Sequence, residues 1–99
     1  MQDKLNIMAA IVSEQYLAFL RARYPNTTYD YAKDATVTVH IGKKYARVDV
    51  GSSGKYMVDL ETGEIFGIKG YGVIHKGHRY GTLDTLDEWN WGAYEAFKR

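Results

Sequence analysis

The sequence predicts an α+β fold: an N-terminal helix, a four-stranded antiparallel meander sheet, a glycine-rich connection and a C-terminal helix. Apolar residues recur at three- and four-residue steps over residues 4–23, which is helical spacing. Residues 35–69 instead alternate apolar with polar residues and are broken by three short polar turns, which is typical of antiparallel strands. The chain has 99 residues, of which 45% are hydrophobic. This suffices for one domain, residues 1–99, with a single core.

The predicted N-terminal helix has an apolar stripe and signals at both ends. The stripe consists of Leu5, Met8, Val12, Tyr16 and Phe19. We expect Asp3 to be its N-cap, because a short acidic side chain accepts hydrogen bonds from the first free N–H groups. Pro25 disfavours helical geometry at Tyr24, and the helix should therefore end there.

The four predicted strands are ATVTVHI, YARVDV, KYMVDL and IFGIK, and the turns between them are GKK, GSSG and ETGE. Their alternation gives the sheet one apolar face, and we expect the N-terminal helix to cover that face. The opposite face would present polar side chains to water or to a partner. On the first two strands these are Thr36, Thr38, His40, Tyr45, Arg47 and Asp49.

The last element is predicted to be a helix that starts at Leu86, because Thr85 and Glu88 have the spacing of a capping box. Trp89 and Trp91 would lie on different sides of this helix, so we expect one of them in the core. For Trp91 two interpretations stay open. It is either an exposed interface anchor or a core residue that packs on the 67–82 segment and pins it.

Residues 67–85 form the glycine-rich connection, which holds five of the ten glycines. Residues 67–82 contain three cations and two histidines but no acid. Glycine allows close approach of a backbone to a ligand, cations can neutralise phosphates, and Tyr71 and Tyr80 can stack on bases. The segment is therefore either a phosphate-facing loop or a turn region whose cations are simply solvated.

The sequence carries no catalytic or metal-binding signature. His75 and His78 could ligate a metal with Asp84 as third ligand, but there is no cysteine, and zinc sites want three or four ligands. We therefore predict no metal, no cofactor and no enzymatic activity. His40 beside Arg47 on neighbouring strands is compatible with a general-acid pair and equally with a surface pair.

The segment TGEIFGIKGYGVIHKGHRYGTLDT resembles small, mostly uncharacterised bacteriophage proteins. They share with this chain a KY…RV…G strand, a VDLETGEIFGIK hairpin and a YGTLDT ending, over about residues 43–85. The resemblance implies a phage or mobile-element product in the bacterial cytoplasm of a host cell. It carries over no activity and no functional residue.

Together these features predict a non-catalytic binding protein that inhibits a bacterial host protein or ribonucleoprotein complex stoichiometrically, such as a CRISPR-type defence effector. The expected contact residues are Lys69, Tyr71, His75, Lys76, His78, Arg79, Tyr80 and Trp91. The alternative is a nucleotide- or single-stranded nucleic-acid-binding module that uses the 67–82 loop, although a net charge of only +1 counts against it. We expect no membrane partner, because no apolar run approaches the ~18 residues that span a bilayer. An edge strand of the meander could also pair with a copy of itself.

Overall fold

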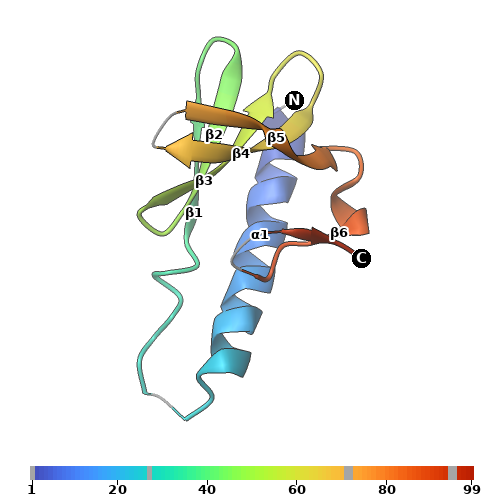
Figure 1. Cartoon of the computed structure of the whole chain (residues 1–99). Coiled ribbons are helices and arrows are strands. Elements are labelled where there is room, and N and C mark those ends of the chain that lie inside the picture. The colour runs from blue at the N-terminus through green and yellow to red at the C-terminus, as the bar shows by residue number, and fades with distance from the viewer. Residues whose placement is uncertain (1, 27, 71–72, 94–95) are drawn as a thin grey trace.

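The computed structural model describes residues 2–26, 28–70, 73–93 and 96–99, with a long helix against a curved antiparallel sheet (Figure 1). The helix is α1, Gln2–Arg23. The sheet contains β1 Val37–Ile41, β2 Tyr45–Val50, β3 Ser53–Asp59, β4 Glu64–Gly70 and β5 Val73–Thr82. A 3-10 turn, η1 Leu86–Glu88, follows, and then a small two-stranded sheet of β6 Trp89–Asn90 and β7 Phe97–Lys98.

The N-terminal helix is confirmed, and the stripe predicted for it faces the core. Leu5, Met8 and Val12 are almost completely buried, while the helix ends two residues before Pro25. Asp3 lies inside the first turn and not at the N-cap position, because the helix already includes Gln2. An acidic side chain in the first turn still interacts favourably with the helix dipole. Within the described residues, no helix is long and apolar enough to cross a membrane.

The sheet is an antiparallel meander, as predicted, but it has five strands in the order β1-β2-β3-β4-β5. The prediction of four strands was wrong because residues 73–82 do not form an open connection. They pair with β4 as a fifth strand. Glycine weakens a strand without forbidding it, and here the pairing is interrupted by register shifts that accommodate the irregular segment.

The core lies between α1 and the inner face of the sheet. Alternate residues of β2 and β3 point into it, as the sequence pattern predicted. They are Ala46, Val48, Val50, Tyr56 and Val58. Ile65 of β4 and Trp91 belong to the same core, and both are fully buried.

The predicted C-terminal helix is absent from the described residues. Thr85 does not cap a helix, because its Oγ1 accepts a hydrogen bond from the backbone N–H of Thr82 at 2.9 Å. The chain makes one 3-10 turn and then becomes extended at Trp89, with φ −123° and ψ 148°. In extended backbone, residues two apart share a face, whereas in a helix they do not. Trp89 and Trp91 can therefore both pack beside Tyr80, with ring centroids 5.7 and 6.2 Å away.

Candidate functional site

The glycine-rich segment forms a hairpin of β4 and β5 with a pronounced bulge. Phe66 of β4 pairs with Arg79, and the next residue, Gly67, pairs with His75. Residues 76–78 consequently have no partner in β4 and protrude from the ladder. Bulges of this kind bend a strand and re-aim its side chains, and they are common beside functional sites.

The two histidines of the hairpin stack on each other across this bulge. The rings of His75 and His78 have centroids 4.3 Å apart and planes inclined by 22°. A Cβ at Gly77 would lie 3.0 Å from the His75 ring, so glycine lets that ring cover the bulge. The lone pairs of an imidazole lie in the plane of its ring. Because the two rings are stacked, their lone pairs do not point at a common position where a metal ion could bind.

The proposed third metal ligand is engaged elsewhere, since Asp84 forms an ion pair with Lys4 at 2.7 Å. No group of three or more histidine, aspartate or glutamate side chains that could hold a metal occurs in the part of the chain that the structure describes.

The cations of the hairpin are less isolated than the sequence suggested. Arg79 Nε lies 2.6 Å from Glu64 Oε2, so β4 supplies an acid to a segment that has none of its own. Lys76 and His78 are exposed. Two predicted contacts cannot be placed: Tyr71, and the side chain of Lys69, lie outside the described residues.

Tyr80 and Trp91 belong to the core and not to the exposed surface. Tyr80 is 9% exposed and Trp91 is 0% exposed. Their rings pack against Tyr56 in T-shaped contacts, with centroids 5.5 and 5.2 Å away. Of the two interpretations left open for Trp91, the exposed anchor does not hold and the core residue does, because its indole is buried and packs on Tyr80 of the 67–82 segment.

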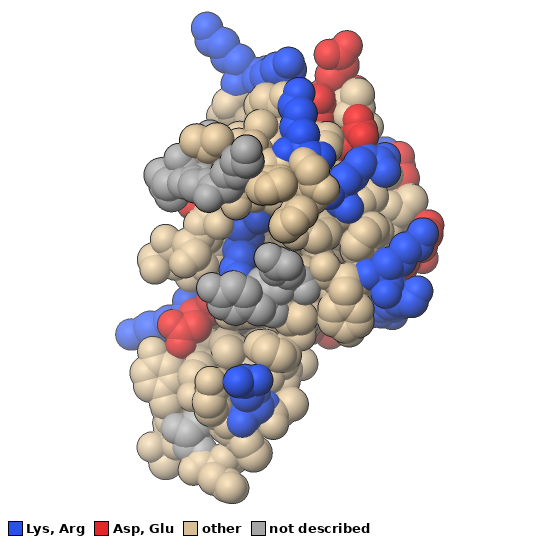
Figure 2. Space-filling model, viewed as in Figure 1, with Lys and Arg blue, Asp and Glu red and all other residues tan. Residues whose placement is uncertain are grey.

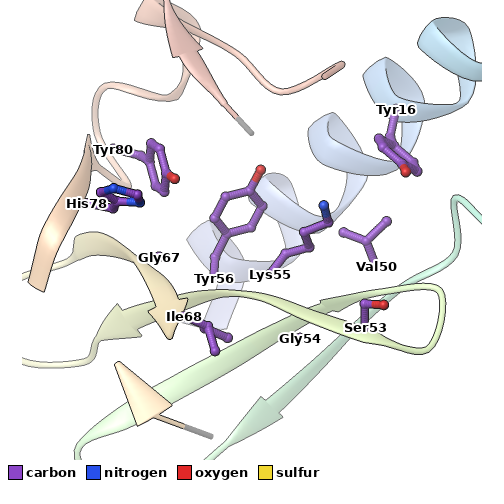
Figure 3. Close-up of a pocket in the computed structure, with 10 residues that line it drawn as sticks. All are labelled: Tyr16, Val50, Ser53, Gly54, Lys55, Tyr56, Gly67, Ile68, His78 and Tyr80. Atoms are coloured by element: carbon purple, nitrogen blue, oxygen red, sulfur yellow. The ribbon is translucent and has the colours of Figure 1, made fainter. Parts of the chain in front are cut away.

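A cavity of about 310 Å³, which the sequence analysis missed, opens where β3 and β4 part (Figure 3). The ladder between these strands consists of the pairs Met57–Phe66 and Val58–Ile65. Beyond them the strands diverge, and residues of α1, β2, β3, β4 and β5 surround the space. The lining residues are Tyr16, Val50, Ser53, Gly54, Lys55, Tyr56, Gly67, Ile68, His78 and Tyr80.

Lys55 enters this cavity because of a second bulge. Val48 pairs with Tyr56 and Asp49 pairs with Gly54, which leaves Lys55 as an extra residue in β3. Regular alternation would place Lys55 and Tyr56 on opposite faces. Figure 3 shows both side chains rising from β3 toward α1, and Lys55 Nζ lies 5.9 Å from the Tyr16 ring centroid. No local sequence signal marks this bulge.

The polar outer face of the sheet holds a compact charge network. Asp49, although only 7% exposed, accepts a hydrogen bond from Arg47 Nε at 2.9 Å. His40 Nε2 lies 3.3 Å from the other carboxylate oxygen. The pair of His40 and Arg47 noted in the sequence is thus joined by a shared acid, an arrangement that satisfies a buried carboxylate.

A cluster of tyrosines follows α1. Tyr24 and Tyr29 both pack against Tyr31, with ring centroids 5.5 and 4.8 Å away. The carboxylate of Asp34 raises the pKa of Tyr29, first through its charge and then through a hydrogen bond. The segment that follows α1 forms the lower end of the molecule in Figure 2. The surface there is mostly tan, whereas the charged side chains gather around the sheet.

The bulged hairpin and the cavity are adjacent, because His78 belongs to the first and lines the second. The described residues therefore present two adjacent candidate sites: the edge strand β5 and the cavity that His78 lines. None of the family models, curated proteins or solved structures with which we compared the chain matches it.

Proposed function

We propose that this chain is a non-catalytic, phage-type binding protein that inhibits a bacterial host complex stoichiometrically, such as a CRISPR-type effector. The β4–β5 hairpin is the element that contacts the target. One observation carries this proposal: four consecutive strand residues, Lys76, Gly77, His78 and Arg79, are all exposed. A strand that lies flat on its core buries every second residue. This stretch therefore presents both of its faces outward.

The position of β5 in the sheet also favours protein binding. It is the last strand of the order β1-β2-β3-β4-β5, so one backbone edge faces away from its neighbour. An exposed edge can accept a strand from another protein, with main-chain hydrogen bonds giving affinity and side chains giving specificity. A copy of this chain is one such partner, and a host protein is another.

The charge of the hairpin suits an acidic partner surface. Arg79 is held by Glu64, but both side chains are partly exposed, at 52% and 33%. Exposed ion pairs contribute only about 0–1 kcal/mol, so Arg79 can exchange Glu64 for a partner carboxylate at little cost. Lys76 adds a second cation beside it.

The test is affinity capture of the full chain from bacterial host lysates, followed by mass spectrometry and measurement of the stoichiometry of the captured complex. Lys76→Glu reverses a charge on the exposed bulge, and Lys43→Glu is the matched control on the exposed turn before β2. We expect the unaltered chain and Lys43→Glu to capture the same protein in a fixed ratio, and Lys76→Glu to recover at least about tenfold less.

Equal capture by Lys76→Glu would exclude the hairpin as the contact. Recovery of nucleic acid alone, with binding that falls steeply as salt is added, would instead favour the nucleic-acid-binding alternative. Capture of no protein above background would refute the proposed function itself.

A further inference from the structure

We infer that β1, the edge strand at the other end of the sheet from β5, pairs with β1 of a second copy of this chain in antiparallel orientation. The two five-stranded sheets would then form one continuous sheet around a two-fold axis. Each β5 would remain at an outer end of this sheet. The dimer would therefore leave both β4–β5 hairpins free for the proposed host contact.

The hydrogen bonds at the two ends of the β1–β2 ladder show which backbone groups of β1 point outward. The N–H of Gly42 donates to the carbonyl oxygen of Tyr45 at 2.9 Å, and the N–H of Gly51 donates to that of Thr36 at 2.8 Å. In an antiparallel ladder, hydrogen-bonded and non-hydrogen-bonded pairs alternate, so the even-numbered residues of β1 bond to β2. The odd-numbered residues therefore direct their N–H and C=O groups toward the edge of the sheet. They are Val37, Val39 and Ile41.

A two-fold axis at Val39 uses all of these outward groups at once. Val39 would pair with Val39 of the second copy, and Val37 would pair with Ile41 of the second copy and the reverse. Each of these is a hydrogen-bonded pair, which exchanges two N–H···O bonds. On the outer face, Thr38 would lie opposite His40 of the second copy, so no two like charges would be directly opposed. The strand is thus complementary to itself.

The strand β1 lacks the devices that protect sheet edges from pairing. Such edges commonly carry charged side chains, a proline or a bulge. The sequence of β1, VTVHI, contains no lysine, arginine, acid or proline, and its ladder with β2 has no register shift. The strand β5 has both a bulge and the cations Lys76 and Arg79. This difference favours β1 for regular strand pairing, whereas the side chains of β5 suit the host contact.

An exposed apolar side chain lies on this edge. Ile41 is 54% exposed, although it falls on the same face of β1 as Val37 and Val39, which pack against the core. In the register centred on Val39, Ile41 would lie beside Val37 of the second copy. Cross-strand pairs of β-branched residues stabilise a sheet, so the dimer would cover a surface that the single chain leaves in water.

The charges at the two ends of β1 favour the antiparallel orientation. Asp34 precedes the strand and Lys43 and Lys44 follow it, and all three are exposed. Antiparallel pairing brings the start of one strand to the end of the other, so Asp34 would approach the two lysines of the second copy. Lys33 weakens this attraction, but with Asp30 the segment before β1 still holds more acids than bases. Opposite charges therefore meet at both ends of the interface.

The first test is the oligomeric state of the isolated full chain, measured by sedimentation. A pair of five-residue strands makes a small interface, so we expect a dimer with a dissociation constant on the order of 100 μM. Amide hydrogen exchange at about 10 μM and about 1 mM then locates the contact. Exchange at Val37, Val39 and Ile41 should slow at least about threefold at the higher concentration. The amides of Thr38 and His40, which already bond to β2, should change less.

A matched pair of variants separates the two edges of the sheet. Ile41→Lys places a charge on β1, and Val73→Lys places the same charge on β5, at residues that are both 54% exposed. We expect Ile41→Lys to weaken the dimer at least about tenfold, because its lysine would be desolvated in the interface. Val73→Lys should leave the dissociation constant within about twofold of the unaltered chain. If Ile41→Lys does not fold, the exchange pattern of the unaltered chain decides.

A chain that stays monomeric at about 1 mM would overturn this inference. So would a dimer that Ile41→Lys leaves intact or that Val73→Lys dissociates, or exchange at Val37, Val39 and Ile41 that does not depend on concentration. Protection of these amides only in a captured host complex would assign the edge to the host protein instead. The measurements on the isolated chain involve no host protein, so this inference and the proposed function can fail separately.

Discussion

The indole Nε1–H of Trp91 donates a hydrogen bond to the backbone carbonyl oxygen of Leu86 at 3.0 Å. Both groups are buried, so the bond satisfies a donor and an acceptor that water does not reach. The backbone N–H of Trp91 donates to Gln15 Oε1 at 2.7 Å, which attaches the same residue to α1. Trp91 therefore holds the segment after β5 against both the helix and the sheet.

This arrangement predicts that the stability of the whole domain depends on Trp91. Replacement by alanine should lower the free energy of unfolding by about 3–5 kcal/mol, since the indole is fully buried. Replacement by phenylalanine should cost less, because a ring remains and only the bond to Leu86 and part of the volume are lost. Urea denaturation followed by circular dichroism measures both changes.

Phe97→Ala provides the control. Because Phe97 is 51% exposed, this substitution should change the free energy of unfolding by less than about 1 kcal/mol. If Trp91→Ala were no more destabilising than Phe97→Ala, the assignment of Trp91 to the core would be wrong.

The parts of the fold that the sequence predicted are those in which local pattern and tertiary burial agree. Leu5, Met8 and Val12 recur with helical spacing, and all three lie against the sheet. Val48 and Val58 fall on the apolar side of alternating strands, and both are fully buried. Here the period of the hydrophobic residues alone determines the element and the face that it buries.

The C-terminal segment departs from prediction because tertiary burial outweighs a local signal. Thr85 and Glu88 have capping-box spacing, but the Thr85 hydroxyl accepts a hydrogen bond from the backbone N–H of Thr82 instead. The extended backbone that follows lets Trp89 and Trp91 pack together. A capping box is worth about 1 kcal/mol, whereas burying a tryptophan is worth several. The spacing of two tryptophans could have signalled an extended segment.

The cavity could not be predicted, because it depends on register. Nothing in the sequence around Lys55 shows that β3 contains an extra residue. Strict alternation with Tyr56 would place this lysine on the outer face of the sheet, away from the cavity. In the same way, the residues between His75 and Arg79 read as a loop when their pairing with β4 is unknown. Bulges are properties of two strands together, and a single-strand pattern does not contain them.

A second prediction concerns Gly92, where a side chain would meet backbone. A Cβ at this position would lie 2.5 Å from the carbonyl oxygen of Gln15, and neither the helix nor the anchored segment can move easily. We expect Gly92→Ala to destabilise the domain by about 1–3 kcal/mol, as overpacking does elsewhere. Thermal or urea unfolding measures the change.

Gly77 is the matched comparison for Gly92. A Cβ there would approach the His75 ring at 3.0 Å, but a ring at the end of a side chain can rotate away. Gly77→Ala should therefore change stability by less than about 1 kcal/mol. An equal effect of the two substitutions would show that contact with the Gln15 backbone is not what constrains Gly92.

A third prediction compares the Asp49–Arg47 ion pair of the sheet with the Glu64–Arg79 ion pair. Asp49 and Arg47 have side chains that are only 10% and 22% exposed. Asp49→Ala would remove the carboxylate to which Arg47 Nε donates and should cost about 1–3 kcal/mol. Glu64→Ala breaks a pair with Arg79 that is much more exposed and should cost less than about 1 kcal/mol.

Urea denaturation at low and high salt distinguishes the two cases. Salt should reduce the small effect of Glu64→Ala further, since exposed charges are screened, while the effect of Asp49→Ala should persist. Equal effects at both sites would mean that the burial of Asp49 does not strengthen its pairing.

The last prediction follows from the pKa of Tyr29, which Asp34 raises first through its negative charge and then through a hydrogen bond. A raised pKa means that the folded chain favours the neutral phenol. The corresponding stabilisation is complete below the ordinary pKa of tyrosine and is lost as the pH rises through the raised value. Asp34→Asn removes the charge, so the pKa of Tyr29 should fall toward its ordinary value.

Asp30 also raises this pKa but is the smallest of the contributions, and Asp30→Asn should therefore have a weaker effect. An NMR titration of the Tyr29 ring carbons measures the three proteins directly. A larger shift for Asp30→Asn than for Asp34→Asn would contradict the packing of Tyr29 beside Asp34.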